Sequence, residues 1–465
     1  GRVPNPAGKT MRLITGCLLF VVVATQEIAY DPPRMVDEVA IDPVFLNDEP
    51  KLVNDPIIME DPELVNEPEM VDEPELVNDP IVLDEPAMVD EPEMVDEPSD
   101  ILTEPLEEGR RFKRQAEVNR AWPNGVIPIS FSSTYPDKQK ASAEAGMKRW
   151  EANTCVRFRR NDVSSKDRVE IVNGASCQSY VGRYGGRQTV ILGPACNGIS
   201  TSAHELGHAL GLQHMQTRAD RDTYVTLQTG NINRGTFDLN FKVEATAQNL
   251  SVPYDITSIM HYQPYDFASN TQLPSIVPKS MFAEYSKCMG NYEPSFYDYL
   301  RVNKLYKCDQ KCASYGTQCS NNGVMDVNNC NQCLCPAGWG GKTCSENPAG
   351  STTLTPTGSW QQIQTTIGNP QDDQLAEFSY KHLVITAPAG RKVEARIDYM
   401  WAGDSAGCKF GGIEIFEKQD TRITPPRVCK MADAKSWYRS PSQRMYIRLY
   451  NRFSQLTAHI SYRYI

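Results

Sequence analysis

Three of the six histidines of this chain fall in the stretch HELGHALGLQH, which spans 204–214. His204 and His208 are four residues apart, so a helix would place both imidazoles on one face. His214 lies further along and can reach the same point only if the chain turns after His208. Gly211 stands where that turn is needed, because glycine adopts left-handed backbone conformations without steric cost. The spacing therefore predicts three imidazoles around one ion.

Three nitrogen ligands with a fourth position open to water form the arrangement that Zn²⁺ takes in catalytic sites. Zinc lowers the pKa of water and polarises a carbonyl group. Glu205 would project about 100° from His204 on a helix, beside the imidazoles, where its carboxylate could take a proton from water and deliver it to a leaving amine. The pattern predicts hydrolysis of peptide bonds. The alternative is an amphipathic core helix whose histidines are incidental.

These residues need a framework to hold them. An apolar face roughly opposite the two helical histidines is formed by Ile199, Ala203, Leu206 and Leu210. Upstream periodicity predicts strands at 125–131, 156–160 and 168–172 and a helix at 137–155. The stretch YVGRYGGRQTVIL at 180–192 predicts one strand interrupted by glycines. A mixed α+β domain is therefore expected around the histidines.

The chain has 465 residues, which favours three or more domains. Residues 11–25, MRLITGCLLFVVVAT, have the basic start and apolar run of a signal peptide, or else form a buried core strand. Residues 1–10 resemble untranslated sequence, and no later stretch is apolar and long enough to cross a bilayer. The expected localisation is secreted and extracellular. The 14 cysteines agree, because disulfides persist outside the cell.

Residues 31–109 form an acidic repeat. They hold 27 Asp and Glu and only Arg34 and Lys51 as cations, a net charge of −25, and proline recurs every six residues from Pro50 to Pro98. Regular proline excludes helix interiors and central strands, and like charges repel. An extended chain with polyproline-II character is expected.

The repeat ends at RRFKRQ, residues 110–115. This stretch resembles a processing-protease site cut between Arg114 and Gln115; the alternative is a plain basic run. Residues 110–465 carry a net charge of +12, so the segment before the cut is interpreted as an acidic pro-region held partly by electrostatic attraction.

The C-terminal third is divided by its composition. Six cysteines fall between 312 and 344, a segment too small to build a core without disulfides; fifteen pairings are possible, and a zinc site is the alternative. A linker rich in Ser, Thr, Pro and Gly follows. Short alternating segments at 360–465 then predict an all-β sandwich.

The pattern H-E-x-x-H-x-x-G-x-x-H with SIMHY at 258–262 is that of metzincins. With TRADRDTYV (217–225), NRAWPNGVIPISF (119–131) and CQSYVGRYGGRQTVILGPAC (177–196), the chain resembles the astacin family of secreted zinc metalloendopeptidases over about 115–308. The resemblance implies a two-lobed domain in which His204, His208 and His214 bind one zinc ion. It implies that Glu205 is the catalytic base and acid, and that Tyr262 is an extra ligand that stabilises the oxyanion. Met260 would lie under the histidines.

The downstream segments resemble an EGF-like and a CUB domain. The resemblance implies the disulfides Cys155–Cys308, Cys177–Cys196, Cys312–Cys330, Cys319–Cys333, Cys335–Cys344 and Cys408–Cys429, which leaves Cys288 alone. Gly411 stands where calcium-binding CUB domains carry Asp, so no calcium is expected there.

Two departures concern activation. Met215 replaces the acidic residue that usually anchors the processed N-terminus of the family. No F-x-G-D inhibitory stretch is present; FLND at 45–48 is the nearest, so Asp48 is a candidate for blocking the zinc. Asn249 lies in a glycosylation sequon, NLS.

The expected organisation is a signal peptide at 11–25, a propeptide at 26–114, a zinc protease domain at 115–308, an EGF-like domain at 309–345, a linker at 346–359 and a CUB-like domain at 360–465. The expected function is a secreted zymogen of a zinc endopeptidase. Its partners would be extracellular proteins or peptides of matrix, cuticle or egg envelope and a processing protease, with no nucleic acid and no membrane span. The alternatives are an inactive binding protein that acts through its EGF and CUB modules, and a structural matrix protein whose acidic repeats bind cations.

Overall fold

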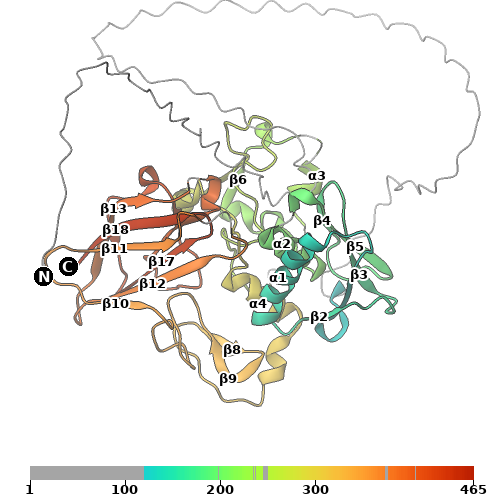
Figure 1. The fold of residues 1–465 in the computed structure, drawn as a ribbon, viewed down its shortest axis with the longest axis horizontal. Coiled ribbons are helices and arrows are strands. Elements are labelled where there is room, and N and C mark those ends of the chain that lie inside the picture. Colours follow the sequence, from blue (N-terminus) through green and yellow to red (C-terminus); the bar gives the residue numbers. More distant parts are fainter. Residues whose placement is uncertain are drawn as a thin grey trace, which may run out of the picture. The chain divides into compact units, whose positions relative to one another are not determined.

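The computed structural model describes residues 120–465, except for 197, 234, 236, 245–249, 372–374 and 404. All of this described chain belongs to one compact unit. The predicted signal peptide and propeptide, with Asp48, Arg114 and Gln115, and the sequon residue Asn249 lie outside the described residues. Along the sequence, a mixed α/β part is followed by a small cysteine-rich part and then by a two-sheet β part (Figure 1).

The first part contains a five-stranded sheet of order β2-β1-β3-β5-β4. Its strands are β1 (Val126–Phe131), β2 (Arg157–Arg160), β3 (Arg168–Val172), β4 (Cys177–Ser179) and β5 (Arg187–Leu192). The first four strands in this order pair in parallel and β4 is antiparallel to β5. The strands expected at 125–131, 156–160 and 168–172 are confirmed within one residue at either end.

The single strand expected at 180–192 is wrong. Only 187–192 is a strand there, and it pairs back on β4 through a reversal at 180–186. Gly182, Gly185 and Gly186 have φ of +72°, +95° and +70°, a backbone region that side-chain-bearing residues rarely adopt. The glycines therefore make a turn rather than interrupt a strand.

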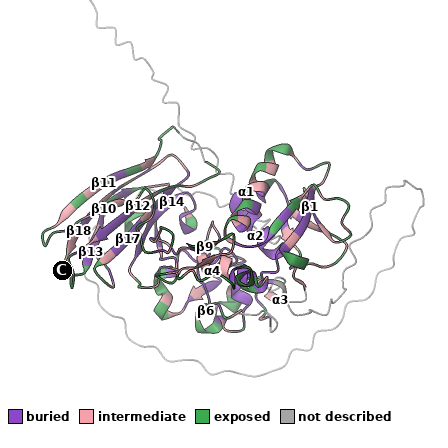
Figure 2. Cartoon of the chain, turned by 90° about the horizontal axis from the view of Figure 1, so that it is seen from below, coloured by how far each residue is buried: buried purple, intermediate pink, exposed green. Residues whose placement is uncertain are grey.

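Two helices lie beside each other against this sheet, α1 (Asp137–Asn153) and α2 (Ile199–Ala209) (Figure 1). The indole Nε1 of Trp150 donates to the carbonyl oxygen of Ala203 at 2.8 Å. A Cβ on Gly146 would lie only 2.9 Å from the backbone nitrogen of Ala203, so the absence of a side chain lets the helices approach. Every residue of α2 is buried (Figure 2). The expected helix at 137–155 is confirmed and ends two residues early.

The chain after α2 is largely irregular. It forms a two-stranded pair, β6 (Val225–Leu227) with β7 (Ile276–Pro278), a short helix α3 (Phe237–Asn240) and a longer helix α4 (Phe296–Leu305). Aromatic and aliphatic side chains of this region form a separate apolar cluster that includes Met215, Phe241 and Tyr262. The first cluster, around the sheet, α1 and α2, contains Met260. The histidine segment is thus held between two cores.

The cysteine-rich part is a hairpin of β8 (Val324–Asp326) and β9 (Asn329–Leu334). Disulfides join Cys155–Cys308, Cys177–Cys196, Cys312–Cys330, Cys319–Cys333, Cys335–Cys344 and Cys408–Cys429, the six pairs that the resemblance implies. Cys288 is buried and forms no disulfide.

The last part is the expected β-sandwich. One sheet has the order β10-β12-β17-β14-β15 and the other β11-β18-β13-β16. Their strands are β10 (Thr352–Leu354), β11 (Gln361–Gly368), β12 (Ser379–Thr386), β13 (Val393–Trp401), β14 (Gly411–Phe416), β15 (Arg427–Val428), β16 (Tyr438–Arg439), β17 (Arg444–Asn451) and β18 (Gln455–Tyr464). Apolar residues of both sheets form one core, which includes Ile385, Ile397, Ile447 and Ile460.

Within the described residues, no helix has the combined length and apolarity needed to span a bilayer.

The close approach of α1 and α2 is testable. Gly146→Ala places a methyl group against helix backbone that cannot give way, so we expect a loss of about 1–3 kcal/mol in the free energy of unfolding. Gly230→Ala is the matched control, because that position is exposed with open space around its Cα. Thermal and denaturant unfolding followed by circular dichroism measures both. Equal stability of the two variants would contradict the packing described here.

Candidate metal centre

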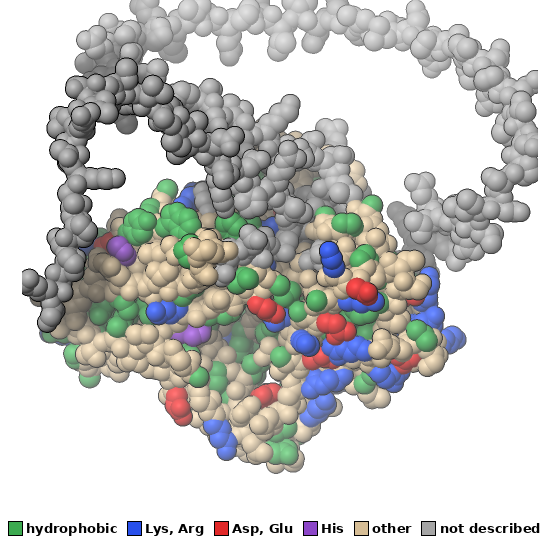
Figure 3. All heavy atoms as spheres, in the orientation of Figure 1, with side chains coloured by type: hydrophobic (Ala, Val, Ile, Leu, Met, Phe, Trp, Pro, Cys, Tyr) green, Lys and Arg blue, Asp and Glu red, His purple; other side chains and the backbone are tan. Residues whose placement is uncertain are grey.

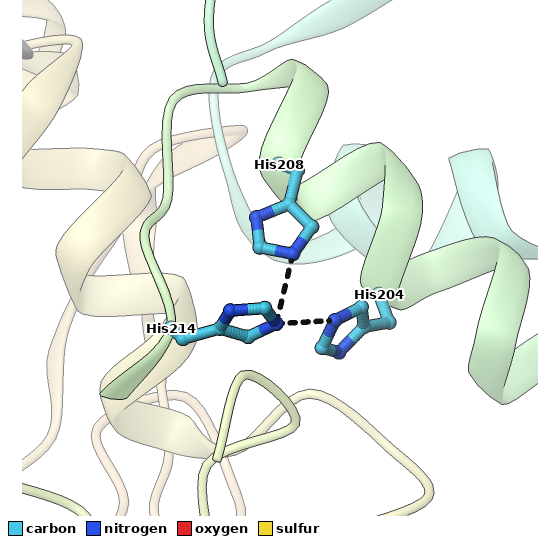
Figure 4. Close-up of side chains that lie close together, drawn as sticks. All are labelled: His204, His208 and His214. Carbon is cyan, nitrogen blue, oxygen red and sulfur yellow. Dashed lines mark hydrogen bonds between the residues drawn. The ribbon is translucent and has the colours of Figure 1, made fainter. Parts of the chain in front are cut away.

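The three histidines converge on one point (Figure 4). His204 and His208 project from α2, and His214 comes from the segment beyond it. The chain reverses at Gly211, whose φ is +106°, as the sequence predicted. The Nε2 atom of His214 lies 3.3 Å from Nε2 of His204 and 3.2 Å from Nε2 of His208.

The hydrogen bonds on the far side of two rings fix which nitrogen carries the proton. Nδ1 of His204 donates to the carbonyl oxygen of Ile259 at 2.8 Å, and Nδ1 of His208 donates to that of Leu212 at 2.8 Å. A carbonyl can only accept, so both Nδ1 atoms are protonated and both Nε2 atoms of the neutral rings carry lone pairs. Lone pairs that converge in this way in a buried site can hold a cation between them.

The separations suit zinc. Nitrogens bound at about 2.0–2.1 Å in a tetrahedral arrangement are roughly 3.3 Å apart. The observed 3.2 and 3.3 Å match that value, and all three ligand atoms lie within 4.8 Å of one another. The residues present therefore fit a single zinc ion with three imidazole ligands.

Glu205 and Tyr262 are both buried near the histidines. Glu205 follows His204 on α2 and is 1% exposed. The ring of Tyr262 packs on the ring of His214, with centroids 4.4 Å apart, and its hydroxyl donates to Oδ1 of Asn240 at 3.2 Å. The fold brings the expected acid–base residue and the expected oxyanion donor to the same place as the three imidazoles.

Met260 packs beneath the helix that carries the histidines. It is fully buried, and a Cβ on Gly207 would lie 2.8 Å from its sulfur atom. Its carbonyl oxygen accepts from the backbone nitrogen of Met215 at 2.7 Å, which ties the Met260 segment to the residue next to His214. The side chain of Met215 lies in an apolar cluster, so residue 215 offers no carboxylate for a buried salt link.

Two arginines hold the chain beyond His214. Arg218 is 2% exposed and makes a two-pronged pair with Asp220, at 2.9 and 2.7 Å. Nη1 of Arg221 donates to the carbonyl oxygen of Gln216 at 2.9 Å, and Oε1 of Gln216 accepts from the backbone nitrogen of Tyr262 at 3.2 Å. The segments that carry His214 and Tyr262 are thereby linked.

Asp298 of α4 holds the segment that orients His204. Its carboxylate accepts from Oγ of Ser258 at 2.5 Å and from the backbone nitrogen of Ile259 at 2.9 Å. The carbonyl of the same Ile259 receives the His204 proton. Asp298 also forms a capping box with Ser295 at the start of α4. The cap of one helix is thus connected to a ligand on another.

Asp298, Asn240 and Gln216 are not among the site residues predicted from the sequence. A signal existed for Asp298, because Ser295-x-x-Asp298 before an apolar run has the form of a capping box. It predicts a helix start and says nothing of the Met260 segment. Asn240 and Gln216 carried no signal, since their partners lie 22 and 46 residues away along the chain.

Asp255 lies close to Asp298 in the interior. Burial, with the neighbouring carboxylate of Asp298, raises the pKa of Asp255 to about 6. Its Oδ1 accepts from the backbone nitrogen and the hydroxyl of Thr257, at 2.9 and 2.7 Å. These bonds favour the charged form but do not offset its desolvation.

Comparison with known proteins gives a consistent result. The family model for Astacin, a peptidase family, matches residues 114–307. The chain is 33% identical over 360 residues to zinc metalloproteinase nas-31 of Caenorhabditis elegans, across 76% of this chain and 58% of that protein. It is 33% identical over 374 residues to zinc metalloproteinase nas-25 of the same organism, across 77% of this chain and 92% of that protein.

Among solved structures, the chain is similar to high choriolytic enzyme 1, a hatching enzyme zinc-protease from the medaka fish Oryzias latipes. The identity is 35%, with 40% of this chain and 92% of that chain covered and a TM-score of 0.37. Of the two relatives from Caenorhabditis elegans, the chain spans little more than half the length of nas-31 and nearly all of nas-25.

The link from Asp298 to His204 predicts a metal-binding phenotype. Asp298→Asn cannot accept from both Ser258 and Ile259 as the carboxylate does, so the carbonyl that orients His204 loses its support. We expect zinc to dissociate about 10–100-fold faster into a chelator, the range found when a partner of a metal ligand is removed. Ser295→Ala is the control, because it removes the helix cap and leaves the Asp298 bonds to the Met260 segment. Equal dissociation rates in the two variants would show that Asp298 acts only through α4.

The raised pKa of Asp255 predicts a pH-dependent stability difference. The pKa of Asp255 in the folded state, about 6, exceeds the ordinary value of 3.8. Between these two pH values the folded state keeps a proton on Asp255 that the unfolded chain has released. Stability contributed by the neutral acid is therefore present below about pH 4 and is lost as pH rises to 6. Asp255→Asn has no ionisable group at this position and so does not lose this stability. We expect the free energy of unfolding of the variant, relative to that of the native chain, to rise by on the order of 2 kcal/mol between pH 4 and 7.

Denaturant unfolding of zinc-free protein at intervals between pH 4 and 7 measures that difference. A difference independent of pH would contradict the burial of an ionisable Asp255.

Proposed function

Because the chain belongs to the astacin family of zinc metallopeptidases, we propose that it is a secreted endopeptidase, made as a zymogen, that hydrolyses peptide bonds of extracellular proteins. The observation that carries the proposal is the convergence of imidazole lone pairs beside a buried carboxylate on the same helix. Peptide-bond hydrolysis needs a Lewis acid that polarises the carbonyl, a base for water and a proton donor for the leaving amine. The imidazoles would hold a metal ion for the first role, and Glu205 would fill the other two.

His204, His208 and His214 would hold the zinc ion. The bound metal supplies Lewis-acid polarisation of the carbonyl and makes water more acidic. Glu205 would accept the proton of water as water attacks the peptide carbonyl, and would then donate it to the departing amine nitrogen. Its burial removes competing bulk water from the proton path.

Tyr262 is proposed as the oxyanion donor and additional ligand. Its hydroxyl donates to Asn240 in this structure, and a change of partner would aim the same O–H at the developing negative charge. The packing of its ring on His214 limits where the hydroxyl can go. Met260 supports the site from below through contact with Gly207 rather than through chemistry.

The accessory parts are proposed as an EGF-like domain at 309–345, joined by the linker at 346–359 to a CUB-like domain at 360–465. Three disulfides within one short segment and a two-sheet β-sandwich support these assignments. The sandwich contacts the protease part: Nη2 of Arg427 donates to the carbonyl oxygen of Cys288 at 2.9 Å, and the hydroxyl of Tyr285 donates to that of Thr424 at 3.0 Å. The EGF-like and CUB-like domains would restrict which extracellular substrates reach the site. Matrix, cuticle or egg-envelope proteins are the proposed class of substrate.

Activation and modification are proposed from the sequence alone. Residues 26–114 would be the propeptide, removed by a cut between Arg114 and Gln115, with Asp48 as the candidate zinc-blocking residue. Asn249 would carry a glycan. Met215 in place of an acidic residue leaves the mature N-terminus without its usual partner at that position.

The proposal is tested by separating metal binding from turnover. We expect Glu205→Ala to retain one zinc per chain and to lose at least about 100-fold in kcat/KM on a protein substrate, because the proton acceptor is gone while the ligands remain. Zinc content by mass spectrometry and cleavage of a fluorescent protein substrate provide the two measurements. Glu144→Ala, a surface change on α1, is the control. Undiminished turnover by the Glu205 variant would refute the role proposed for Glu205. A zinc-loaded chain that has been cut after Arg114 and still shows no turnover would favour the inactive binding protein.

A further inference from the structure

A basic cavity lies where the EGF-like and CUB-like parts meet. Its volume is about 440 Å³, within the range of ligand-binding pockets. Four cations line it: Arg391, Lys392, Lys418 and Arg444. The amide groups of Asn321 and Gln443 and the hydroxyl groups of Thr421 and Ser442 also line it. Among the described residues that line the basic cavity, none is acidic.

Three of these cations have no carboxylate partner in the described part of the chain. Lys418 lies 3.6 Å from Glu284, whereas Arg391, Lys392 and Arg444 take part in no ion pair there. Arg444 is the most constrained of them. Its guanidinium stacks on Trp339 with 4.0 Å to the ring centroid and donates to Oδ1 of Asn347 at 3.1 Å.

Burial without an anion is costly for Arg444. Desolvation lowers the pKa of its guanidinium to about 10, so the group is still charged at neutral pH but poorly solvated. An anion bound in the basic cavity would offset that cost through charge-assisted hydrogen bonds. The stacking on Trp339 holds the donor fork in place for such a ligand.

A second cation-rich surface of the described chain is partly neutralised by its own carboxylates. Over α1, β2 and β3, basic and acidic side chains are interspersed (Figure 3). Arg160 pairs with Glu144 and Glu151, Arg159 with Asp162 and Arg187 with Glu170. These ion pairs compensate part of the positive charge of that surface. The basic cavity differs because three of its four cations, Arg391, Lys392 and Arg444, have no carboxylate partner in the described part of the chain.

The chain itself contains a polyanion that matches the basic cavity. Residues 31–109 carry a net charge of −25, and units such as Asp72-Glu73-Pro74-Glu75 place three carboxylates on four residues. In the extended form expected for such a sequence, one unit is about 12 Å long. Repetition of the unit and its covalent attachment raise its effective concentration, so modest affinity per unit suffices.

We propose that the basic cavity binds carboxylate side chains of the acidic repeat, so that the repeat remains associated with the protein when the chain is cut at Arg114. The ligand is an acidic peptide, and Arg391, Lys392 and Arg444 are its contacts. The cut at Arg114 rests on the proposed function, but binding in the basic cavity requires neither the zinc site nor catalysis, so a failure of this inference leaves the proposed function untouched.

The test is cross-linking of the full chain with a carbodiimide, which joins carboxylates to amines, followed by mass spectrometry. We expect the acidic repeat to cross-link to Lys392 about fivefold or more above the exposed lysines Lys138, Lys148 and Lys166, because a bound unit holds carboxylates at that amine. At about 1 M NaCl the excess should disappear, since the screening length falls to about 3 Å.

Variants locate the interaction. Arg391→Gln with Arg444→Gln should lower the Lys392 cross-links several-fold while leaving that amine intact. Arg159→Gln with Arg187→Gln is the control. It removes the same charge from the surface near the five-stranded sheet, where both arginines have carboxylate partners, and should leave the Lys392 cross-links unchanged. Because Arg444 packs on Trp339, its replacement can also disturb the fold. Arg391→Gln alone provides a second variant, since Arg391 is exposed and its ring contact, with Tyr464 at 5.5 Å, is longer than the 4.0 Å contact of Arg444.

Three results would overturn the inference. The first is cross-linking of the repeat to all exposed lysines alike. The second is an equal effect of the cavity and control variants. The third combines two observations: the acidic repeat cross-links to lysines outside the basic cavity, and the cavity variants, but not the control variant, lose retention on a heparin column. That result would assign the basic cavity to a sulfated glycan.

Discussion

The site depends on two hydrogen bonds that face away from it. The carbonyl oxygens of Ile259 and Leu212 each accept a proton from an imidazole Nδ1, and so leave the Nε2 lone pairs of His204 and His208 pointing at the same place as His214. With the other tautomer, the rings would present N–H groups to one another and no cation could be held. Much of the surrounding structure serves to keep those two carbonyls where they are.

The support of each carbonyl differs. Leu212 lies just beyond the turn at Gly211, so its carbonyl is positioned by local backbone geometry. Ile259 belongs to a distant loop and is held by Asp298, a helix-cap residue of α4. The disulfide Cys155–Cys308 in turn fixes the chain after α4 to the chain after α1. Contact of α1 with α2 through Gly146 and Trp150 completes the frame around the histidines. One ligand is thus oriented by its own turn and the other by tertiary packing.

Charge is distributed in two distinct ways over the molecule. Several cations near the five-stranded sheet are paired with carboxylates a few residues or one strand away, which partly neutralises that surface. The cations of the basic cavity come from separate turns and strands of the sandwich and meet Trp339 of the cysteine-rich part. A cluster of like charges is destabilising by itself, so its persistence in the fold is consistent with a ligand of opposite charge. The acidic repeat supplies that charge within the same chain.

The sequence by itself determined the chemistry and much of the local structure. The 204–214 pattern specified three nitrogens, an adjacent carboxylate and a turn, because these depend on helical spacing and on glycine at one position. Strand periodicity predicted β1, β2, β3 and the sandwich, since alternation is a local property. It failed at 180–186, where glycines make a reversal that alternation cannot distinguish from a strand. Only the tertiary structure decided the protonated nitrogens and the roles of Asp298, Asn240 and Gln216. His204 and Ile259 are 55 residues apart, and a contact over that distance is set by how helices and loops pack rather than by any spacing along the chain.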